Sequence, residues 1–382
     1  MKTIDIIFLV LAAIGIIQGF MLIAALLQRS LRRKTNYYLV AAIFFIIYLV
    51  IEFVLLRRTF LSDIPFFYSS RYGVWLLIGP LLYIYTRSVT DQHPEGRSRF
   101  LHFLPFLIFT VLIPLLFGAY LIHKHSVTYG MLTLLMRDFK YVSGFNYFYS
   151  YLFIAQFIHA AVYLSLSLKI IKSHTSQLKQ AYSNLEVINL NWLKLLISSF
   201  IVLISICILF FIIIINGSYY ERWMDYIYLL PMIIIIYLIA YKSLQQPQLF
   251  AQNEADLNGK KYKDSKLSPE QSLQYKSILE NYMSEHKPQR NSELKLSELA
   301  ESTGIPVRHL SQVLNEQFKQ NFYDFINNYR IRDAKELMKS KTGMNILEIA
   351  YQVGFNNKTS FNNYFKKISE ITPKEYRASL GN

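Results

Sequence analysis

Polar side chains able to hydrogen-bond to base edges recur in two segments that lie 50 residues apart. Arg and Lys can donate to guanine, Asn and Gln can pair with adenine, and Ser and Thr suit several bases. Lysines beside such groups can meet phosphates. The side chains selected on these grounds are Arg308, Ser311, Gln312, Asn315, Lys358, Thr359, Ser360, Asn362, Asn363, Lys366 and Lys367. They can contact double-stranded DNA if both segments are helices that expose them.

The apolar residues around them have the spacing of a helix–turn–helix that occurs twice. The first copy has Leu296, Leu299, Ala300 and Gly304, and the second has Ile346, Ile349, Ala350 and Gly354. Apolar residues at i, i+3 and i+4 form the buried stripe of a helix, and glycine can take positive φ in the turn that follows. The stripes of the next helices are Leu310, Val313, Leu314 and Phe318, then Phe361, Tyr364 and Phe365. The pattern FYDFINNYRIRDAKELMKS predicts one helix joining the two units.

A further helix is predicted upstream of the first copy. Ser268 has the residue type of an N-cap, and Pro269 suits the first helical position. We expect Leu273, Ile278 and Tyr282 to form its apolar face. Residues 245–267 are polar without strong periodicity, which predicts a flexible linker of roughly 25–30 Å reach.

These segments resemble the DNA-binding domain of AraC-family transcription regulators over about Lys295–Arg377. The resemblance rests on LSELAESTGIPVRHLSQVL, INNYRIRDAKELM, EIAYQVGFNNKTSFNNYFKK and TPKEYR. It implies two helix–turn–helix units on a rigid helix, with both recognition helices in successive major-groove turns. Two places depart from the family pattern: Glu370 stands where glycine is frequent, and Gln317–Asn321 reads QFKQN in place of the usual ETG turn.

The first 244 residues have a different composition. The whole chain is 53% hydrophobic with mean hydropathy +0.25, and the apolar residues gather in blocks before about Tyr241. A span needs about 20 apolar residues to cross roughly 30 Å of hydrocarbon. Seven spans are expected: Ile4–Leu27, Tyr37–Leu56, Tyr72–Val89, Phe100–Ile122, Phe145–Ile171, Trp192–Ile215 and Trp223–Leu244. The first is expected to remain uncleaved because a signal-peptide core is shorter.

Charge also divides unevenly between the halves. The chain has a net charge of +15, of which the part after Phe250 carries about +4 and the first 250 residues about +11. Lysines and arginines in the connections number ten on one side and eight on the other. Because positive charge favours the cytoplasmic side, this count slightly favours an outside N-terminus and a cytoplasmic C-terminal domain.

Polar residues inside the expected spans are candidates for a sensing site, since hydrocarbon penalises them. Glu52, Gln156 and His159 are the three that we select. The structural alternatives are a pair of Glu52 with Arg57 or Arg58 and an interhelical hydrogen bond of His159. For His102 and Asp225, near span ends, interfacial placement is favoured.

The sequence thus predicts an all-α chain with a seven-helix transmembrane bundle (1–244), a linker (245–267) and a soluble domain with two helix–turn–helix units (268–382). The favoured function is that of a transcription regulator embedded in the cell membrane by several spans, which binds double-stranded DNA. It is expected to sense an unknown small-molecule or envelope signal, with control through a homodimer. The alternative is a transporter or receptor whose tail docks proteins. No catalytic constellation, metal site or cofactor is expected, and the single Cys207 allows no internal disulfide.

Overall fold

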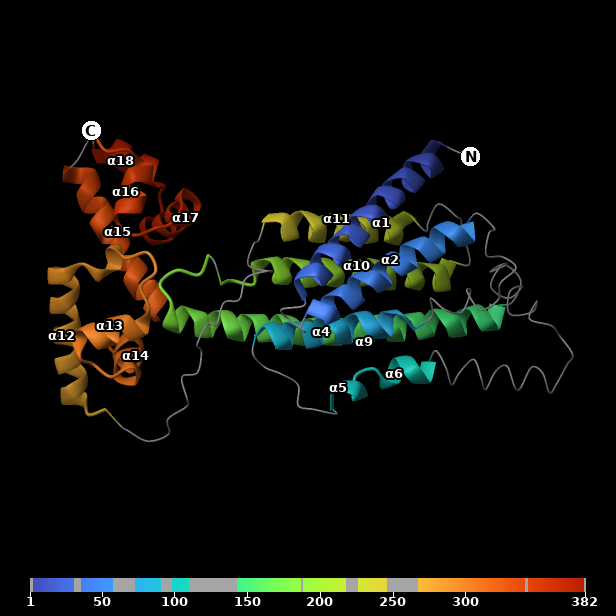
Figure 1. Ribbon diagram of the computed structural model, residues 1–382, viewed down its shortest axis with the longest axis horizontal. Coiled ribbons are helices and arrows are strands. Elements are labelled where there is room, and N and C mark those ends of the chain that lie inside the picture. The colour runs from blue at the N-terminus through green and yellow to red at the C-terminus, as the bar shows by residue number, and fades with distance from the viewer. Residues whose placement is uncertain are drawn as a thin grey trace, which may run out of the picture. The chain divides into compact units, whose positions relative to one another are not determined.

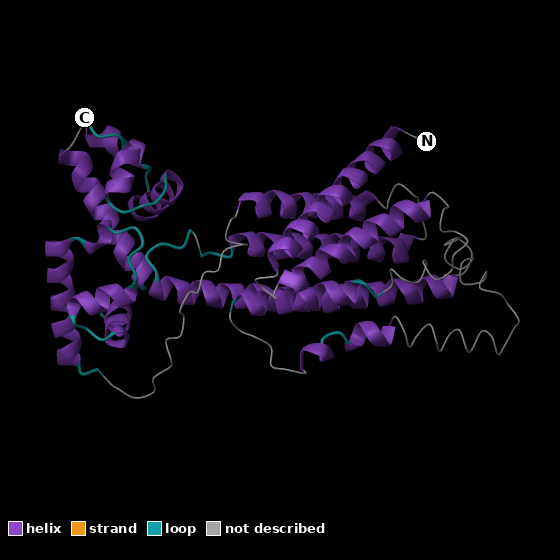
Figure 2. Cartoon of the chain, viewed as in Figure 1, coloured by secondary structure: helices purple, strands orange, loops and turns teal. Residues whose placement is uncertain are grey.

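The computed structural model describes residues 3–30, 36–57, 73–90, 98–109, 143–186, 188–217, 226–245, 267–340 and 343–380. Within these ranges the chain is helical and has no strand, in agreement with the all-α expectation (Figures 1 and 2). It divides into two compact units. The first comprises Met1–Lys172 and Leu190–Gln252, and the second comprises Ser173–Asn189 and Asn253–Asn382.

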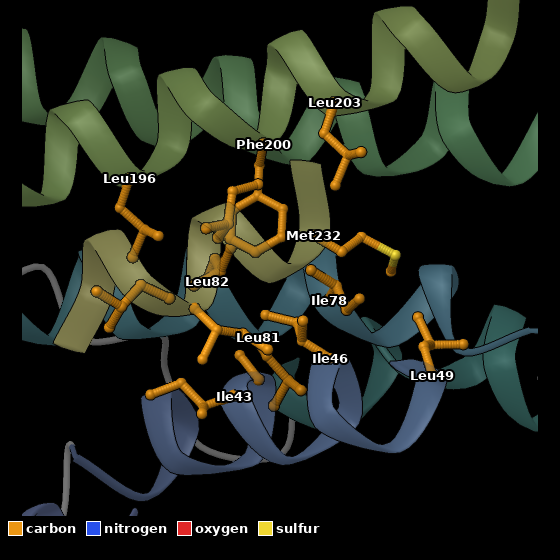
Figure 3. Packing of buried hydrophobic residues seen from close by; sticks show 14 of the residues in the cluster. Ile43, Ile46, Leu49, Ile78, Leu81, Leu82, Leu196, Phe200, Leu203 and Met232 are labelled. Atoms are coloured by element: carbon orange, nitrogen blue, oxygen red, sulfur yellow. The ribbon is translucent and has the colours of Figure 1, made fainter. Parts of the chain in front are cut away.

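The first unit is a bundle of apolar helices. Its elements are α1 (Thr3–Ser30), α2 (Asn36–Arg57), α4 (Trp75–Val89), α5 (Ser98–Leu101), α6 (Leu104–Leu107), most of α9 (Ser143–Ala181), α10 (Asn191–Gly217) and α11 (Tyr226–Gln245). Helix α1 packs on α2 and α11, α2 packs on α4, and α10 packs on α11. Side chains such as Ile46, Leu82 and Phe200 fill the core between them (Figure 3).

A small residue sets the distance between α4 and α9. A Cβ on Gly79 would lie 2.9 Å from the Cα of Ala160, so only glycine fits at this crossing. Small residues at helix contacts allow such close approach. The outward faces of this unit are apolar as well, with Ile17, Val202 and Ile234 more than half exposed.

The expected number of seven spans is corrected to three candidate spans among the described residues: Ile6–Leu27, Phe153–Ala181 and Asn191–Ile213. Helices α2 and α11 have 22 and 20 residues, and within the residues whose side chains are described their apolar stretches are Asn36–Glu52 and Leu229–Ile239. Helix α4 has 15 residues, which is about 22 Å and less than the hydrocarbon thickness. The fourth expected span begins with two helices of 4 residues each, and residues 110–122 lie outside the described ranges.

The second unit contains short helices. They are α12 (Pro269–His286), the 3-10 turn η4 (Pro288–Arg290), α13 (Leu296–Thr303), α14 (Val307–Glu316), α15 (Phe322–Ser340), α16 (Ile346–Gln352), α17 (Lys358–Ser369) and α18 (Pro373–Leu380). One core joins residues from Leu279 to Ile326, and a second joins residues from Ile331 to Phe365. Helix α15 contributes to both cores, as expected for the linking helix.

The predicted start of α12 is confirmed, but its predicted face is confirmed only for Tyr282, which packs against the first core. The Ser268 hydroxyl accepts a hydrogen bond from the Gln271 N–H at 3.1 Å, with Pro269 at the first helical position. Leu273 and Ile278 are exposed, whereas Leu279 and Met283 are fully buried. The apolar residues of this helix are spread around its axis, so their spacing alone selects no single face.

Candidate nucleic-acid interface

The two predicted helix–turn–helix units are present. The first is α13, a turn at Gly304, and α14. The second is α16, a turn at Gly354, and α17. Both predicted buried stripes are confirmed: Leu310, Val313 and Leu314 are buried in α14, and Phe361, Tyr364 and Phe365 in α17, with Phe318 packed at the edge of the first core.

The polar residues selected in α14 lie on its outer surface to different degrees. Arg308 and Asn315 are exposed, while Ser311 and Gln312 are half-buried. Gln312 donates to Glu316 at 3.0 Å, and Asn315 donates to the carbonyl of Ser311 at 2.8 Å. Arg308, near the start of the helix, is therefore the cation that α14 presents to solvent.

Helix α17 is better capped and presents more cations. The Asn357 side chain, its N-cap, accepts from the Ser360 N–H at 2.8 Å, which satisfies one of the free N–H groups of the first turn. Among the selected residues, Ser360 and Asn362 are half-buried, and the exposed ones are Lys358, Thr359, Asn363, Lys366 and Lys367.

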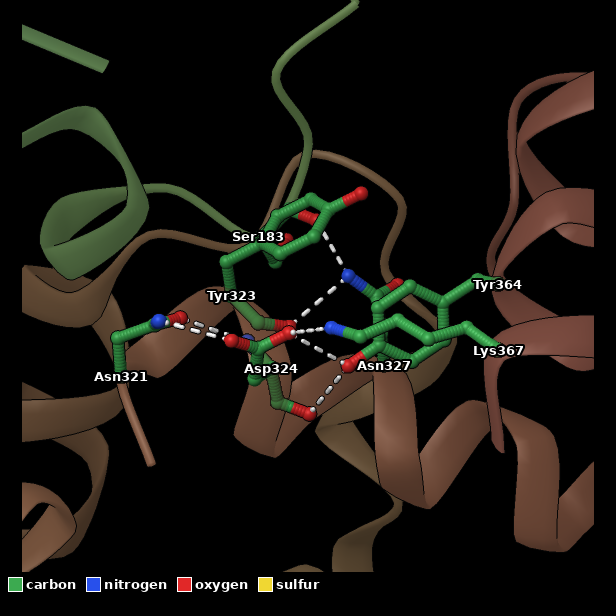
Figure 4. A network of polar contacts seen from close by, with 7 residues as sticks. All are labelled: Ser183, Asn321, Tyr323, Asp324, Asn327, Tyr364 and Lys367. Atoms are coloured by element: carbon green, nitrogen blue, oxygen red, sulfur yellow. Dashed lines mark hydrogen bonds and ion pairs between the residues drawn. The ribbon is translucent and has the colours of Figure 1, made fainter. Parts of the chain in front are cut away.

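Of these cations, Lys367 is already paired with a carboxylate of the C-terminal compact unit. The Lys367 ammonium lies 2.9 Å from Asp324 Oδ1 on α15, which also accepts from the Tyr364 hydroxyl at 2.8 Å (Figure 4). Burial acts to raise the pKa of Asp324, but the hydrogen bonds from Lys367 and Tyr364 outweigh it, so this pKa lies below its usual value. Lys367 therefore fixes α17 to the linking helix, a role that its position in the sequence does not reveal.

Both departures from the family pattern take the left-handed backbone conformation that glycine favours. Glu370, the C-cap of α17, has φ of 64°, and Lys319, after α14, has φ of 55°. A residue with a Cβ is strained in this region. Both positions therefore adopt a backbone conformation that glycine favours, although neither is a glycine.

The most deeply buried cation of this unit is one that the sequence analysis did not select. Arg330 on α15 is 2% exposed, and burial lowers its pKa to about 10, so it remains charged at neutral pH. It donates to the carbonyls of Gln289 and Asn291, both at 2.8 Å. Its guanidinium also lies 5.7 Å from the ring centre of Phe355 in the second turn. Arg330 on α15 thus connects the segment around η4, which precedes α13, with the turn of the second helix–turn–helix unit.

The predicted sensing residues lie on two helices of the first unit. Glu52 on α2 and Gln156 on α9 are each 2% exposed. The Gln156 amide oxygen accepts from the Gly73 N–H at 3.0 Å, while its amide nitrogen has no hydrogen-bond partner. His159 lies against the Tyr163 ring at 4.9 Å, and its Nδ1 has no partner.

The remaining polar candidates of this half are only partly described. The His102 ring nitrogen Nδ1 lies 2.9 Å from the Tyr163 hydroxyl. Asp225 and Arg58 lie outside the described residues, as do the Arg57 side chain and most of the linker. No group of His, Cys, Asp or Glu that could hold a metal ion occurs in the part of the chain that the structure describes.

Comparisons with known proteins match the region of the two units. A family model described as a helix-turn-helix domain (HTH_18) matches residues 299–379. An uncharacterized HTH-type transcriptional regulator of Staphylococcus aureus (strain COL) is 40% identical over 87 residues, covering 23% of this chain and 12% of that protein. The uncharacterized HTH-type transcriptional regulator YtdP of Bacillus subtilis (strain 168) is 30% identical over 112 residues, covering 29% and 14%.

A solved structure is also similar to part of the chain. The C-terminal domain of the two-component response regulator yesN from Fusobacterium nucleatum is 33% identical, with 98% of it covered by 27% of this chain and a TM-score of 0.25. The chain spans only 12–14% of the length of the two curated relatives above. These relatives are transcriptional regulators, a family of non-enzymes, which agrees with the expectation that this chain is not an enzyme. Residues 299–379 of the chain are therefore a helix–turn–helix domain similar to those of HTH-type transcriptional regulators.

Proposed function

We propose that the protein is a transcription regulator that binds double-stranded DNA through α14 and α17. The observation that carries this proposal is the pair of recognition helices with exposed polar faces, held by the single helix α15. Recognition helices enter the major groove, where base edges are distinguishable. Phosphate contacts from Lys366 would add affinity without sequence preference.

The test is an affinity measurement for a selected DNA site with the parent protein and with Arg308→Ala and Lys358→Ala. Each substitution is expected to cost about 1–3 kcal/mol and to relax base preference at its own position. The two affected positions should lie about one helical turn apart, because both helices must reach one face of the duplex. Glu336→Ala, at an exposed position of α15, serves as the control. Equal affinity of the parent for all sequences across salt concentrations would count against base readout.

We further propose that the N-terminal half is embedded in the cell membrane with the C-terminal domain in the cytoplasm. Three helices have the length and apolar composition of a span, and isoleucine, leucine and valine side chains are exposed on α1, α9, α10 and α11. Exposed apolar surface of this extent suits a lipid environment. Reporter fusions near Met1 and after Ser243 should indicate opposite sides of the membrane, and two fusions on the same side would contradict this topology.

Glu52, Gln156 and His159 are proposed as part of the sensing site for a small-molecule or envelope signal. The unpartnered amide nitrogen of Gln156 and ring nitrogen of His159 support this assignment, since buried polar groups without partners are costly. A ligand changes the output only if it binds two arrangements of the bundle with different affinity. The sensing proposal is tested by measuring reporter-gene output from the Glu52→Gln and His159→Ala variants, at equal membrane abundance. If both variants respond to every tested envelope condition as the parent does, these residues are structural. Control through a homodimer, which raises local concentration, belongs to the same proposal.

A further inference from the structure

The connection between α9 and α10 belongs to the same compact unit as the DNA-binding helices. Residues Ser173–Asn189 cluster with Asn253–Asn382. Directly after α9 ends, Tyr182 forms an isolated antiparallel bridge with Lys295, the residue before α13. The Ser183 N–H donates to the carbonyl of Leu294 at 3.2 Å. This segment therefore pairs with the backbone that leads into the first helix–turn–helix unit.

The same segment completes the coordination of the buried Arg330. A guanidinium has five N–H groups, and two of those of Arg330 donate to Ser183, at 3.3 Å to its carbonyl and 3.2 Å to its hydroxyl. The other three donate to the carbonyls of Gln289 and Asn291 and to Asn327 Oδ1. The Ser183 carbonyl also accepts from the Asn327 amide at 3.4 Å (Figure 4). Because a buried charge must keep its partners, Arg330 depends on Ser183.

A second contact extends from this segment toward the other recognition helix. The Asn184 amide donates to Glu293 Oε1 at 3.2 Å, and the same oxygen accepts from the Asn356 amide at 2.8 Å. Asn356 directly precedes Asn357, the N-cap of α17. Through Glu293, Asn184 is thus linked to the residue beside the start of α17.

These contacts meet at the seam between the two cores of the unit. No buried residue is shared by the core that contains α14 and the core that contains α17. The seam is instead occupied by polar groups, among them Arg330, Asn327, Gln289 and Asp333, all of which are buried. Directional hydrogen bonds fix geometry at such a seam more strongly than apolar contacts do.

We propose that Ser183 and Asn184 form a docking element that positions α17 relative to α14, and so sets the spacing between the two groups of base pairs that the protein reads. The proposal rests on the DNA-binding function proposed above. It gives the α9–α10 connection a binding surface on the regulator domain, made of Arg330, Glu293, Leu294 and Lys295. Ser183 and Asn184 are positioning residues, because they act on DNA through Arg330 and Glu293.

Docking in the intact protein can be tested by an engineered disulfide. Paired antiparallel residues have Cα atoms about 4.5–5.5 Å apart, within the range that a disulfide accepts. Tyr182→Cys with Lys295→Cys, in full-length Cys207→Ala protein in its membrane, should therefore cross-link under mild oxidation. Tyr182→Cys with Ser379→Cys, on the exposed last helix, is the control pair. Cross-linking of the two pairs at equal rates would overturn the docking.

The spacing role is tested with DNA duplexes in which the distance between the two recognised groups is changed by one base pair. The full-length parent should prefer one spacing by about tenfold, comparable with the effect of a mismatched base pair. Ser183→Ala with Asn184→Ala should remove most of that preference while the affinity for either group alone is retained. Ser183→Thr, which keeps the hydroxyl, and Gln177→Ala, at an exposed position of α9, should behave as the parent does.

The outcomes separate this inference from the proposed function. A parent protein that binds no duplex refutes the proposed function itself. Unchanged spacing preference in the double variant, with the parent binding normally, overturns only the positioning role. Loss of all binding in the double variant and in Asn184→Ala alone also overturns it, because the segment would then support folding and not spacing.

Discussion

The two helix–turn–helix units share one spacing of apolar residues but place their turns in different surroundings. Gly304 has φ of 66°, and a Cβ built on it meets no atom within 4 Å. Gly354 has φ of 100°, and its Cβ would lie 2.5 Å from the Gln289 carbonyl oxygen and 3.0 Å from Arg330 Nε. The first glycine is needed only for its backbone conformation, whereas the second is also needed for close packing at the seam between the cores.

Alanine substitution should separate the two glycines most clearly. Gly354→Ala is expected to destabilise the unit by about 3 kcal/mol, because strain at positive φ adds to a clash with backbone atoms that cannot move freely. Gly304→Ala should cost only about 1 kcal/mol, the strain term alone. Both losses of stability can be measured by urea unfolding of the detergent-solubilised chain, with protease cleavage of the C-terminal unit as the signal for unfolding. Equal losses would show that the seam can open to accept a methyl group.

The capping of the recognition helices provides a second contrast. The Asn357 side chain caps α17, whereas Pro306, the N-cap of α14, makes no side-chain hydrogen bond. Asn357→Ala should therefore cost about 1 kcal/mol and speed amide exchange in the first turn of α17. Asn357→Asp, which keeps an acceptor, is the control and should retain most of the stability. Unchanged exchange in the alanine variant would mean that tertiary packing holds this turn.

A residue with a left-handed backbone conformation follows each recognition helix: Lys319 follows α14, and Glu370 follows α17. Substitution by glycine should relieve the backbone strain at both positions. Glu370→Gly and Lys319→Gly are each expected to stabilise the unit by roughly 0.5–1 kcal/mol, because relief of left-handed strain exceeds the added entropy of the unfolded chain. Thermal unfolding in the same detergent would detect the gain. Lys374→Gly, in the first turn of α18, is the control and should destabilise. Loss of stability in Glu370→Gly would point to a contact of that side chain that outweighs the strain.

The smallest expected effect is a pH dependence of the stability of the C-terminal compact unit, which contains Asp324. Asp324 has a lowered pKa in the folded state, so its contribution is fully present above the unfolded pKa, near 4, and is lost as pH falls through the folded value. Asp324 is partly exposed, and solvent screens its ion pair with Lys367. Unfolding midpoints of the parent and Asp324→Asn should therefore converge as the pH falls below about 4. A constant difference down to the lowest pH would assign the effect to lost hydrogen bonds alone.

Local patterns predicted the second unit because its helices bury regular stripes. Leu299 with Ala300 and Ile349 with Ala350 are buried as their spacing indicates. The face of α12 was assigned wrongly because Leu273 and Ile278 are apolar but exposed. The contacts of Ser183 with Arg330 could not be predicted, since 147 positions separate them and Ser183 belongs to none of the motifs that indicate the DNA-binding domain. Hydropathy also predicted seven spans, whereas three candidate spans occur among the described residues.

The distance in sequence between Ser183 and Arg330 has a consequence for the order of folding. The contacts inside each helix–turn–helix unit are local and form quickly, whereas closing a loop of 147 residues is entropically costly and slow. Ser183 also leaves the ribosome well before Arg330, with α10 and α11 between them. In a newly made chain, both helix–turn–helix units should therefore fold before their relative position is fixed. The binding of Ser183 to Arg330 then becomes the last step of folding. Pulse-labelled protein should gain resistance to protease within each unit earlier than the Tyr182→Cys and Lys295→Cys variant forms its disulfide.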